Sequence, residues 1–177
     1  MHAYRTRDFS AWENLGVLLS TDARAKGTLF VPRVVYNKAS SKYVMWFENY
    51  NASATPFKPN ATQPKGEYSI AVSDSADRGF VVVKDRENGS ASFACGGSQG
   101  DFDVFLDEAS GKAYIVNTYY TSMCIEELDS TFTGGTNKTA SSRNPLGNQE
   151  STRTSRCGDR LPSAFVDVRS SDDVIAF

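Results

Sequence analysis

The sequence of 177 residues contains only one histidine and three cysteines, and this scarcity limits its chemistry. The histidine, His2, is the second residue of the chain, where it is poorly placed to serve a pocket. Mechanisms that pair a serine or cysteine nucleophile with histidine need an imidazole in the site, so we do not expect them. The cysteines, Cys95, Cys124 and Cys157, lack the close spacing of a zinc site. Any chemistry is therefore expected to depend on carboxylates, without a metal.

The sequence also lacks an excess of basic charge and any long apolar stretch. Its formal net charge is -2, whereas nucleic acid and anionic membranes are bound by a clustered basic face. No apolar run approaches the roughly 18 residues of a membrane span. The opening residues lack the apolar region that is typical of a signal peptide. We therefore expect neither nucleic acid nor a membrane as partner.

Two features bear on the compartment in which the protein folds. The cysteines leave two redox states open, either one disulfide with a free thiol or three buried thiols. Four Asn-x-Ser/Thr sequons, at Asn51, Asn60, Asn88 and Asn137, suggest a secretory ancestry. Ordinary polar loop residues would explain the same pattern. We expect an extracellular origin, although this chain shows no signal peptide.

Two segments of the chain repeat one another at an offset of 70 residues. Residues 34–47, VVYNKASSKYVMWF, align without a gap with residues 104–117, VFLDEASGKAYIVN. Both carry Ala-Ser-x-Lys between apolar runs, a pattern typical of a β-hairpin. Further strand-like runs follow each hairpin, and several short strands at a long period are typical of β-propeller blades. A β-sandwich whose hairpins happen to be similar is the alternative.

These segments resemble glycoside hydrolase family 43, and within it the branch of the exo-β-1,3-galactanases. The resemblance covers about residues 4–133 and is carried by VPRVVYNKASSKYVMWFE, YSIAVSDS and GDFDVFLDEASGKAY. The family consists of five-bladed β-propellers that cleave β-linked galactose, arabinose or xylose. The resemblance therefore implies an all-β fold, a partial five-bladed propeller of two to three blades. It also implies hydrolysis of terminal β-linked galactose from a polysaccharide, without a cofactor.

The resemblance further implies which carboxylates act, since glycosidases place acids around the scissile bond. Asp101 matches the family's orienting aspartate, and Glu48 matches an acid of the galactanase-like sites. Glu150 lies near the position of the general acid, although no apolar strand follows it. Each has an alternative role. Asp101 could cap a turn, with Asp103 in its place if the register is shifted, and Glu48 could end a strand in solvent.

Three residues are candidates for contact with the sugar. Trp46 and Tyr50 could stack on the C–H face of galactose, and Arg33 occupies the position of the family's Arg-Pro pair in reversed order. Strand alternation predicts Trp46 and Glu48 on one face and Phe47 on the other. Because propeller strands are buried on both faces between blades, packing in the core is the alternative for the aromatic residues.

The family's pattern is lost from Ala140 onward. Residues 140–177 are rich in Ser, Arg and Asp with little periodicity, which is typical of loops or disorder. We therefore predict a propeller domain at residues 1–139 and an irregular tail at residues 140–177. A complete five-bladed ring is longer than this chain, so we expect a fragment, or a product with an altered tail, whose hydrolysis is impaired. The alternative is a non-catalytic carbohydrate-binding or pseudoenzyme fragment.

Overall fold

The fold is all-β in the part of the chain that the structure, a computed structural model, describes. The described residues are 1–50, 67–85, 87–89, 91, 102–119, 122–143, 165–166 and 174–176. Within them, twelve strands and one short 3-10 helix, η1 (Thr21–Ala23), account for the regular structure. No helix among these residues is long and apolar enough to cross a membrane.

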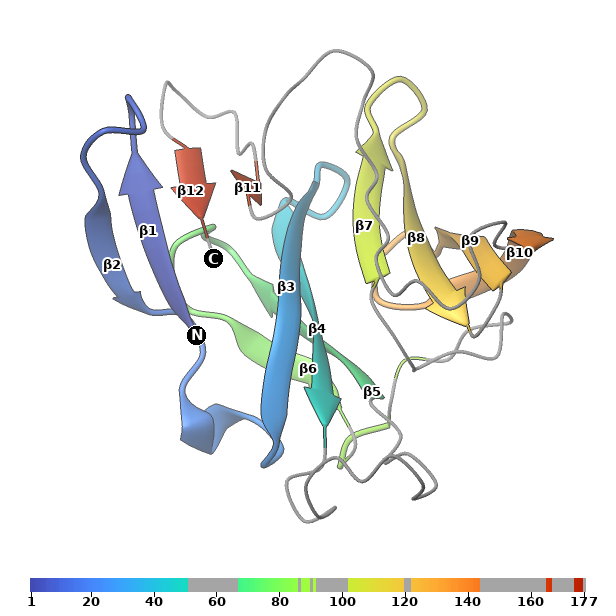
Figure 1. The fold of residues 1–177 in the computed structure, drawn as a ribbon, viewed down its shortest axis with the longest axis horizontal. Coiled ribbons are helices and arrows are strands. Elements are labelled where there is room, and N and C mark those ends of the chain that lie inside the picture. The colour runs from blue at the N-terminus through green and yellow to red at the C-terminus, as the bar shows by residue number, and fades with distance from the viewer. Residues whose placement is uncertain are drawn as a thin grey trace.

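The strands form three antiparallel sheets of four strands each, which stand side by side in Figure 1. Sheet 1 has the order β11-β12-β1-β2, sheet 2 the order β3-β4-β5-β6, and sheet 3 the order β10-β9-β8-β7. The prediction of a partial five-bladed propeller with two to three blades is confirmed. The bounds are β1 (His2–Thr6), β2 (Glu13–Val17), β3 (Thr28–Asn37), β4 (Lys42–Tyr50), β5 (Glu67–Ser73), β6 (Val81–Lys84), β7 (Phe102–Asp107), β8 (Lys112–Tyr119), β9 (Ser122–Leu128), β10 (Gly135–Arg143), β11 (Phe165–Val166) and β12 (Val174–Ala176).

The repeated segments form equivalent hairpins in separate sheets, as predicted. The hairpin β3–β4 belongs to sheet 2 and the hairpin β7–β8 to sheet 3. Their pairing registers are related by the same offset, because Val34 pairs with Met45 and Val104 with Ile115. The strands β3 and β7 also contact one another, so the two sheets are neighbours. The repeat in the sequence is therefore a repeat of blades.

Sheet 2 is buried on both of its faces. Trp46 and Ile70 belong to a core cluster shared with sheet 3, whereas Met45 and Phe47 belong to a cluster shared with sheet 1. All four side chains are fully buried. A continuous apolar run such as Val-Met-Trp-Phe is typical of a strand covered on both sides, and stacked sheets of this kind exclude water from each interface. This layering places β4 at the centre of the described structure.

Sheet 1 combines strands from both ends of the sequence. The strand β12 pairs with β1, so that Tyr4 lies opposite Ala176, and β11 pairs with β12. The strand β10 continues through residue 139 to Arg143. The irregular tail expected from Ala140 onward thus contains strand structure at 140–143 and in β11 and β12. The rest of that segment lies outside the described residues, and the division at residue 139 stays a prediction.

Candidate functional site

One face of sheet 2 brings together several of the residues that the sequence singled out. Glu48 and Tyr50 alternate with Trp46 along β4, so all three point to the same face. Arg33 of β3 is the register partner of Trp46, and partners on antiparallel strands share a face. Since Trp46 packs in the cluster between sheets 2 and 3, this face is the one turned toward sheet 3. The predicted alternation is confirmed, with Phe47 in the opposite cluster.

Burial decreases along this face from the core toward the end of β4. Trp46 is fully buried and donates its indole N–H to the Phe132 carbonyl oxygen at 2.9 Å. Glu48 is only 3% exposed, and Tyr50 is half-buried. Trp46 therefore packs in the core, which was the second of the two roles considered for the aromatic residues. Its ring contacts the core cluster, and its N–H is hydrogen-bonded. We do not include it among the groups that contact sugar.

Phe30 is an exposed aromatic residue at this end of the sheet, and the sequence analysis missed it. It lies opposite Glu48 in the register of β3 and β4 and is 45% exposed. Its ring meets that of Tyr50 edge to face, with centroids 5.3 Å apart. The available signal was Pro32, because a proline within an apolar run marks an edge strand or a bulge. Phe30 and Tyr50 together form what we term the aromatic pair.

A β-bulge separates Phe30 from Arg33 and sets the directions of both side chains. The register of β3 against β4 shifts between these two residues, and Val31 within the bulge has φ +49. A β-branched residue in the left-handed region is strained by about 1–3 kcal/mol. Bulges of this kind redirect side chains and are frequent beside active sites. The strain at Val31 thus marks the segment that positions the aromatic pair.

Arg33 links sheet 2 to sheet 3 through an ion pair. Its Nε donates to Asp103 Oδ1 at 2.9 Å, and the two side chains are 16% and 11% exposed. The same Asp103 oxygen accepts the backbone N–H of Val104. Arg33 and Asp103 are 70 residues apart, the offset of the repeat, so equivalent positions of two neighbouring blades bind each other. The pair joins β3 and β7, the neighbouring edge strands of the two sheets.

Two of the three predicted catalytic carboxylates, Asp101 and Glu150, lie outside the described residues. The predicted approach of Glu48 and Asp101 within about 10 Å therefore stays a prediction. Asp103, the alternative to Asp101, holds the ion pair with Arg33. No group of three or more His, Cys, Asp or Glu side chains suited to a metal ion occurs in the part of the chain that is described.

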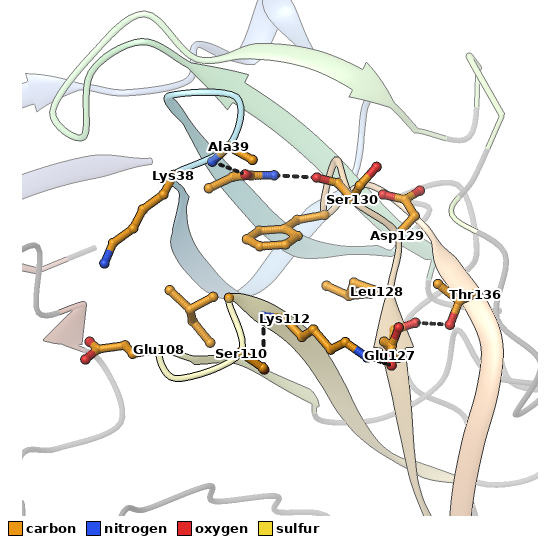
Figure 2. Close-up of a pocket in the computed structure, with 14 residues that line it drawn as sticks. Lys38, Ala39, Glu108, Ser110, Lys112, Glu127, Leu128, Asp129, Ser130 and Thr136 are labelled. Carbon is orange, nitrogen blue, oxygen red and sulfur yellow. Dashed lines mark hydrogen bonds and ion pairs between the residues drawn. The ribbon is translucent and has the colours of Figure 1, made fainter.

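An opening lies beside the turns of the same hairpins, at the end opposite the aromatic pair (Figure 2). It is a cleft of about 470 Å³ with Leu128 and Phe132 among its apolar lining residues and Lys38 and Glu127 among its charged ones. The Asn37 amide donates to the Ser130 carbonyl oxygen at 2.8 Å on one side of this cleft. Of the candidates for catalysis or sugar binding that the structure describes, Arg33, Trp46, Glu48 and Tyr50, none lines this cleft.

Glu127, which lines this cleft, accepts hydrogen bonds from two lysines, and their effect on its pKa can be tested. Hydrogen bonds from Lys112, and then from Lys138, hold the pKa of its carboxyl below the ordinary value near 4.5. A lowered folded-state pKa stabilises the fold above the unfolded pKa, and this contribution is lost as the pH falls through the folded pKa. We expect Lys112→Ala to raise the pKa of Glu127 toward its ordinary value in a side-chain NMR titration. Lys38→Ala, in the same cleft but without a bond to Glu127, should leave it unchanged, and equal shifts would contradict the assignment.

Cys124 of β9 is disulfide-bonded. The sequence left open either one disulfide with a free thiol or three buried thiols, and the structure has a disulfide. Cys95 and Cys157, the other two cysteines, lie outside the described residues. Structural disulfides persist in oxidising compartments and are rare in the cytosol.

The comparison with known proteins supports the resemblance seen in the sequence at the level of the fold. No protein-family model and no curated protein matches the chain. Among solved structures, an exo-β-1,3-galactanase from Clostridium thermocellum is 20% identical with a TM-score of 0.57, over 75% of this chain and 29% of its own. A β-1,3-galactosidase of glycoside hydrolase family 43 is 22% identical with a TM-score of 0.62, over 83% of this chain and 30% of its own.

A third solved structure is the exo-β-1,3-galactanase of Phanerochaete chrysosporium with galactose, which is 19% identical. Its TM-score is 0.60, over 81% of this chain and 32% of its own. The chain thus spans about a third or less of the length of each of these three proteins. The chain has the fold of part of the β-1,3-galactanases and β-1,3-galactosidases of glycoside hydrolase family 43.

Proposed function

We propose that this chain is a family 43-like glycosidase component that binds terminal β-linked galactose of a polysaccharide, with carboxylate chemistry at the bound sugar. The observation that carries the proposal is the cluster of Glu48 and the aromatic pair on one face of sheet 2. It occurs in a fold shared with exo-β-1,3-galactanases, one of which has been solved with galactose. Related arabinose or xylose substrates belong to the same class of ligand.

The aromatic pair supplies the apolar part of this proposed site. Sugar-binding sites combine aromatic surfaces with a few polar groups that fix orientation. Phe30 offers an exposed ring on which the C–H face of galactose can rest, and Tyr50 meets that ring at its edge. We assign Glu48, opposite Phe30 on β4 and 3% exposed, as the polar group that accepts hydrogen bonds from the sugar hydroxyls. Arg33 orients the neighbouring strand through Asp103 instead of contacting the sugar directly.

The proposed hydrolysis uses one carboxyl group to protonate the leaving oxygen and another to orient its partner or activate water. We assign Glu150 as the proton donor and Asp101 as the aspartate that orients it. Glu48 is assigned to bind the sugar hydroxyls. The residues after Glu150, Ser-Thr-Arg-Thr-Ser-Arg, do not form an apolar strand pattern that would hold an acid rigidly. Because an acid reacts efficiently only when a rigid element holds it in reactive geometry, this sequence context leads us to expect binding to exceed catalysis in this chain.

Titration with a β-1,3-linked galactose oligosaccharide tests the proposed site. We expect the wild-type chain to bind and Phe30→Ala to bind about tenfold more weakly, the loss of roughly one aromatic contact. Phe9→Ala is a matched control, since Phe9 is 46% exposed but lies in the turn between β1 and β2. Binding should be followed by calorimetry, and folding of each variant by circular dichroism.

Four outcomes, three of binding titrations and one of an activity assay, separate the parts of the proposal. Equal affinities of the wild-type chain and Phe30→Ala would remove the aromatic pair from the site. Binding of arabinose or xylose oligosaccharides in place of galactose would change the substrate, and binding of no sugar would contradict the function. Release of sugar from β-1,3-galactan well above background, lost in Glu48→Gln, would show an active enzyme and contradict the expected impairment.

A further inference from the structure

Asn137 begins a sequon that is exposed over its whole length. The three residues Asn137, Lys138 and Thr139 lie in β10, and each of them is exposed. They are the only sequon of the four whose three residues are all among those that the structure describes, since Ser90 of the sequon at Asn88 lies outside them. The other two sequons, at Asn51 and Asn60, also lie outside the described residues. A bulky group attached to Asn137 would therefore find room at the surface of the folded protein.

The backbone holds Asn137 in a conformation that leaves its side chain available. Asn137 has φ +65 and sits within the bulge between Gly135 and Thr139. Its backbone N–H donates to Glu126 Oε1 at 2.9 Å, which anchors the bulge to β9. Among the described residues, neither the side-chain amide of Asn137 nor the Thr139 hydroxyl makes a hydrogen bond. Asparagine tolerates the left-handed region better than most residues, so the bulge carries it at little cost.

The position of β10 in the sheet gives a bulky group room. The order β10-β9-β8-β7 makes β10 the edge strand of sheet 3 among the described strands, and it lies at the outer side of the molecule in Figure 1. A second observation points to the compartment in which such a group is added. Cys124, opposite Ser141 in the register of β9 and β10, is disulfide-bonded, and disulfides of this kind form in oxidising compartments such as the secretory pathway.

We propose that Asn137 is an N-glycosylation site of this protein. In the reaction, Asn137 Nδ2 forms a bond to the anomeric carbon of an oligosaccharide that is carried on a lipid pyrophosphate. The bond between that carbon and the pyrophosphate oxygen breaks. The lipid pyrophosphate leaves with the bonding electrons, and one amide proton passes to a base of the transferase. No group is oxidised or reduced.

The glycan would also protect the edge that β10 forms among the described strands of sheet 3. An edge strand presents unpaired N–H and C=O groups that can pair with another chain, and proteins block such edges with charges, bulges or covering groups. The strand β10 already has a bulge and carries Lys138, which binds Glu127 Oε1 at 3.1 Å. A hydrated glycan on Asn137 adds bulk at the same place. We therefore expect the glycosylated chain to aggregate less than the unmodified one.

The test is glycopeptide mass spectrometry on the full chain, secreted from a eukaryotic host through an added leader. We expect a glycan on the peptide that contains Asn137, and removal by an amidase that converts the modified asparagine to aspartate. Asn137→Gln and Thr139→Ala should each lose this glycan, whereas Thr139→Ser keeps the sequon and should retain it. Formation of the Cys124 disulfide in the same sample shows that the chain entered the oxidising lumen.

An unmodified Asn137 in a sample with the disulfide formed would overturn the inference, whatever the state of the other sequons. The wild-type peptide is read directly, so the result does not depend on the folding of any variant. Light scattering of wild-type and Asn137→Gln protein then tests the protective role. Equal aggregation of the two would leave the modification in place but contradict its function at the edge.

Discussion

Trp46→Ala should lower the free energy of unfolding by roughly 3–5 kcal/mol, the range for truncation of a large buried aromatic side chain. Trp46 is fully buried in the cluster between sheets 2 and 3, so its loss leaves a cavity at the interface of two blades. Its indole N–H also satisfies the Phe132 carbonyl oxygen, which would be left without that donor. Denaturant unfolding followed by circular dichroism measures the change.

The chain contains its own matched control, because its other tryptophan is exposed. Trp12 lies outside the core clusters at 40% exposure, and we expect Trp12→Ala to change stability by less than about 1 kcal/mol. Trp46→Phe should fall between the two, since it keeps most of the ring and loses the hydrogen bond. Similar losses for Trp12→Ala and Trp46→Ala would mean that Trp46 is not buried between blades. That result would also reopen its role as a sugar platform.

Asp103→Ala should lower the free energy of unfolding by about 3 kcal/mol, because it leaves the Arg33 guanidinium largely buried without its partner. The ion pair is 2.9 Å long, and both side chains are less than a fifth exposed. The double replacement Arg33→Met with Asp103→Leu removes both charges and should cost much less than the sum of the single changes. Thermal and denaturant unfolding of the two single variants and the double variant measure the coupling.

An exposed ion pair provides the comparison for this result. Lys42 and Asp74 form a bond of 2.5 Å, with side chains 43% and 84% exposed. We expect Asp74→Ala to change stability by no more than about 1 kcal/mol, the usual range for surface pairs. If Asp103→Ala cost as little as Asp74→Ala, the contact between Arg33 and Asp103 would not hold the two sheets together.

Local pattern was sufficient to predict the two repeated hairpins, but it predicted an irregular tail where the structure has the end of β10 and the strands β11 and β12. The period of two in VVYNKASSKYVMWF predicted which side chains share a face, and the structure has Trp46 and Glu48 on one face with Phe47 on the other. The Ala-Ser-x-Lys turns predicted equivalent hairpins, and their registers match at the offset of 70 residues. These properties depend on residues close in the sequence, where side-chain alternation and turn geometry act directly.

The candidate site was only partly predictable, because it also depends on features that local pattern does not determine. Glu48 was named from the resemblance and Tyr50 from its aromatic ring, and the structure has them on one face beside Phe30. The exposure of Phe30 depends on a bulge that the apolar run TLFVPRVV does not reveal, apart from its proline. Asp101 and Glu150 keep the status of predictions, because the structure does not describe them.

By itself, the sequence determined the two repeated hairpins and the alternation of side chains along β4, since these follow from repetition and from periodicity within short segments. Its resemblance to a known family implied the all-β class and the burial of β4 on both faces. Only the tertiary structure decided that Trp46 packs in the core and that Arg33 binds Asp103 of the next blade. It also decided that β12 completes a sheet begun by β1. Contacts of this kind join residues far apart in the chain. They depend on how whole sheets stack and twist against one another, which no local pattern of residues specifies.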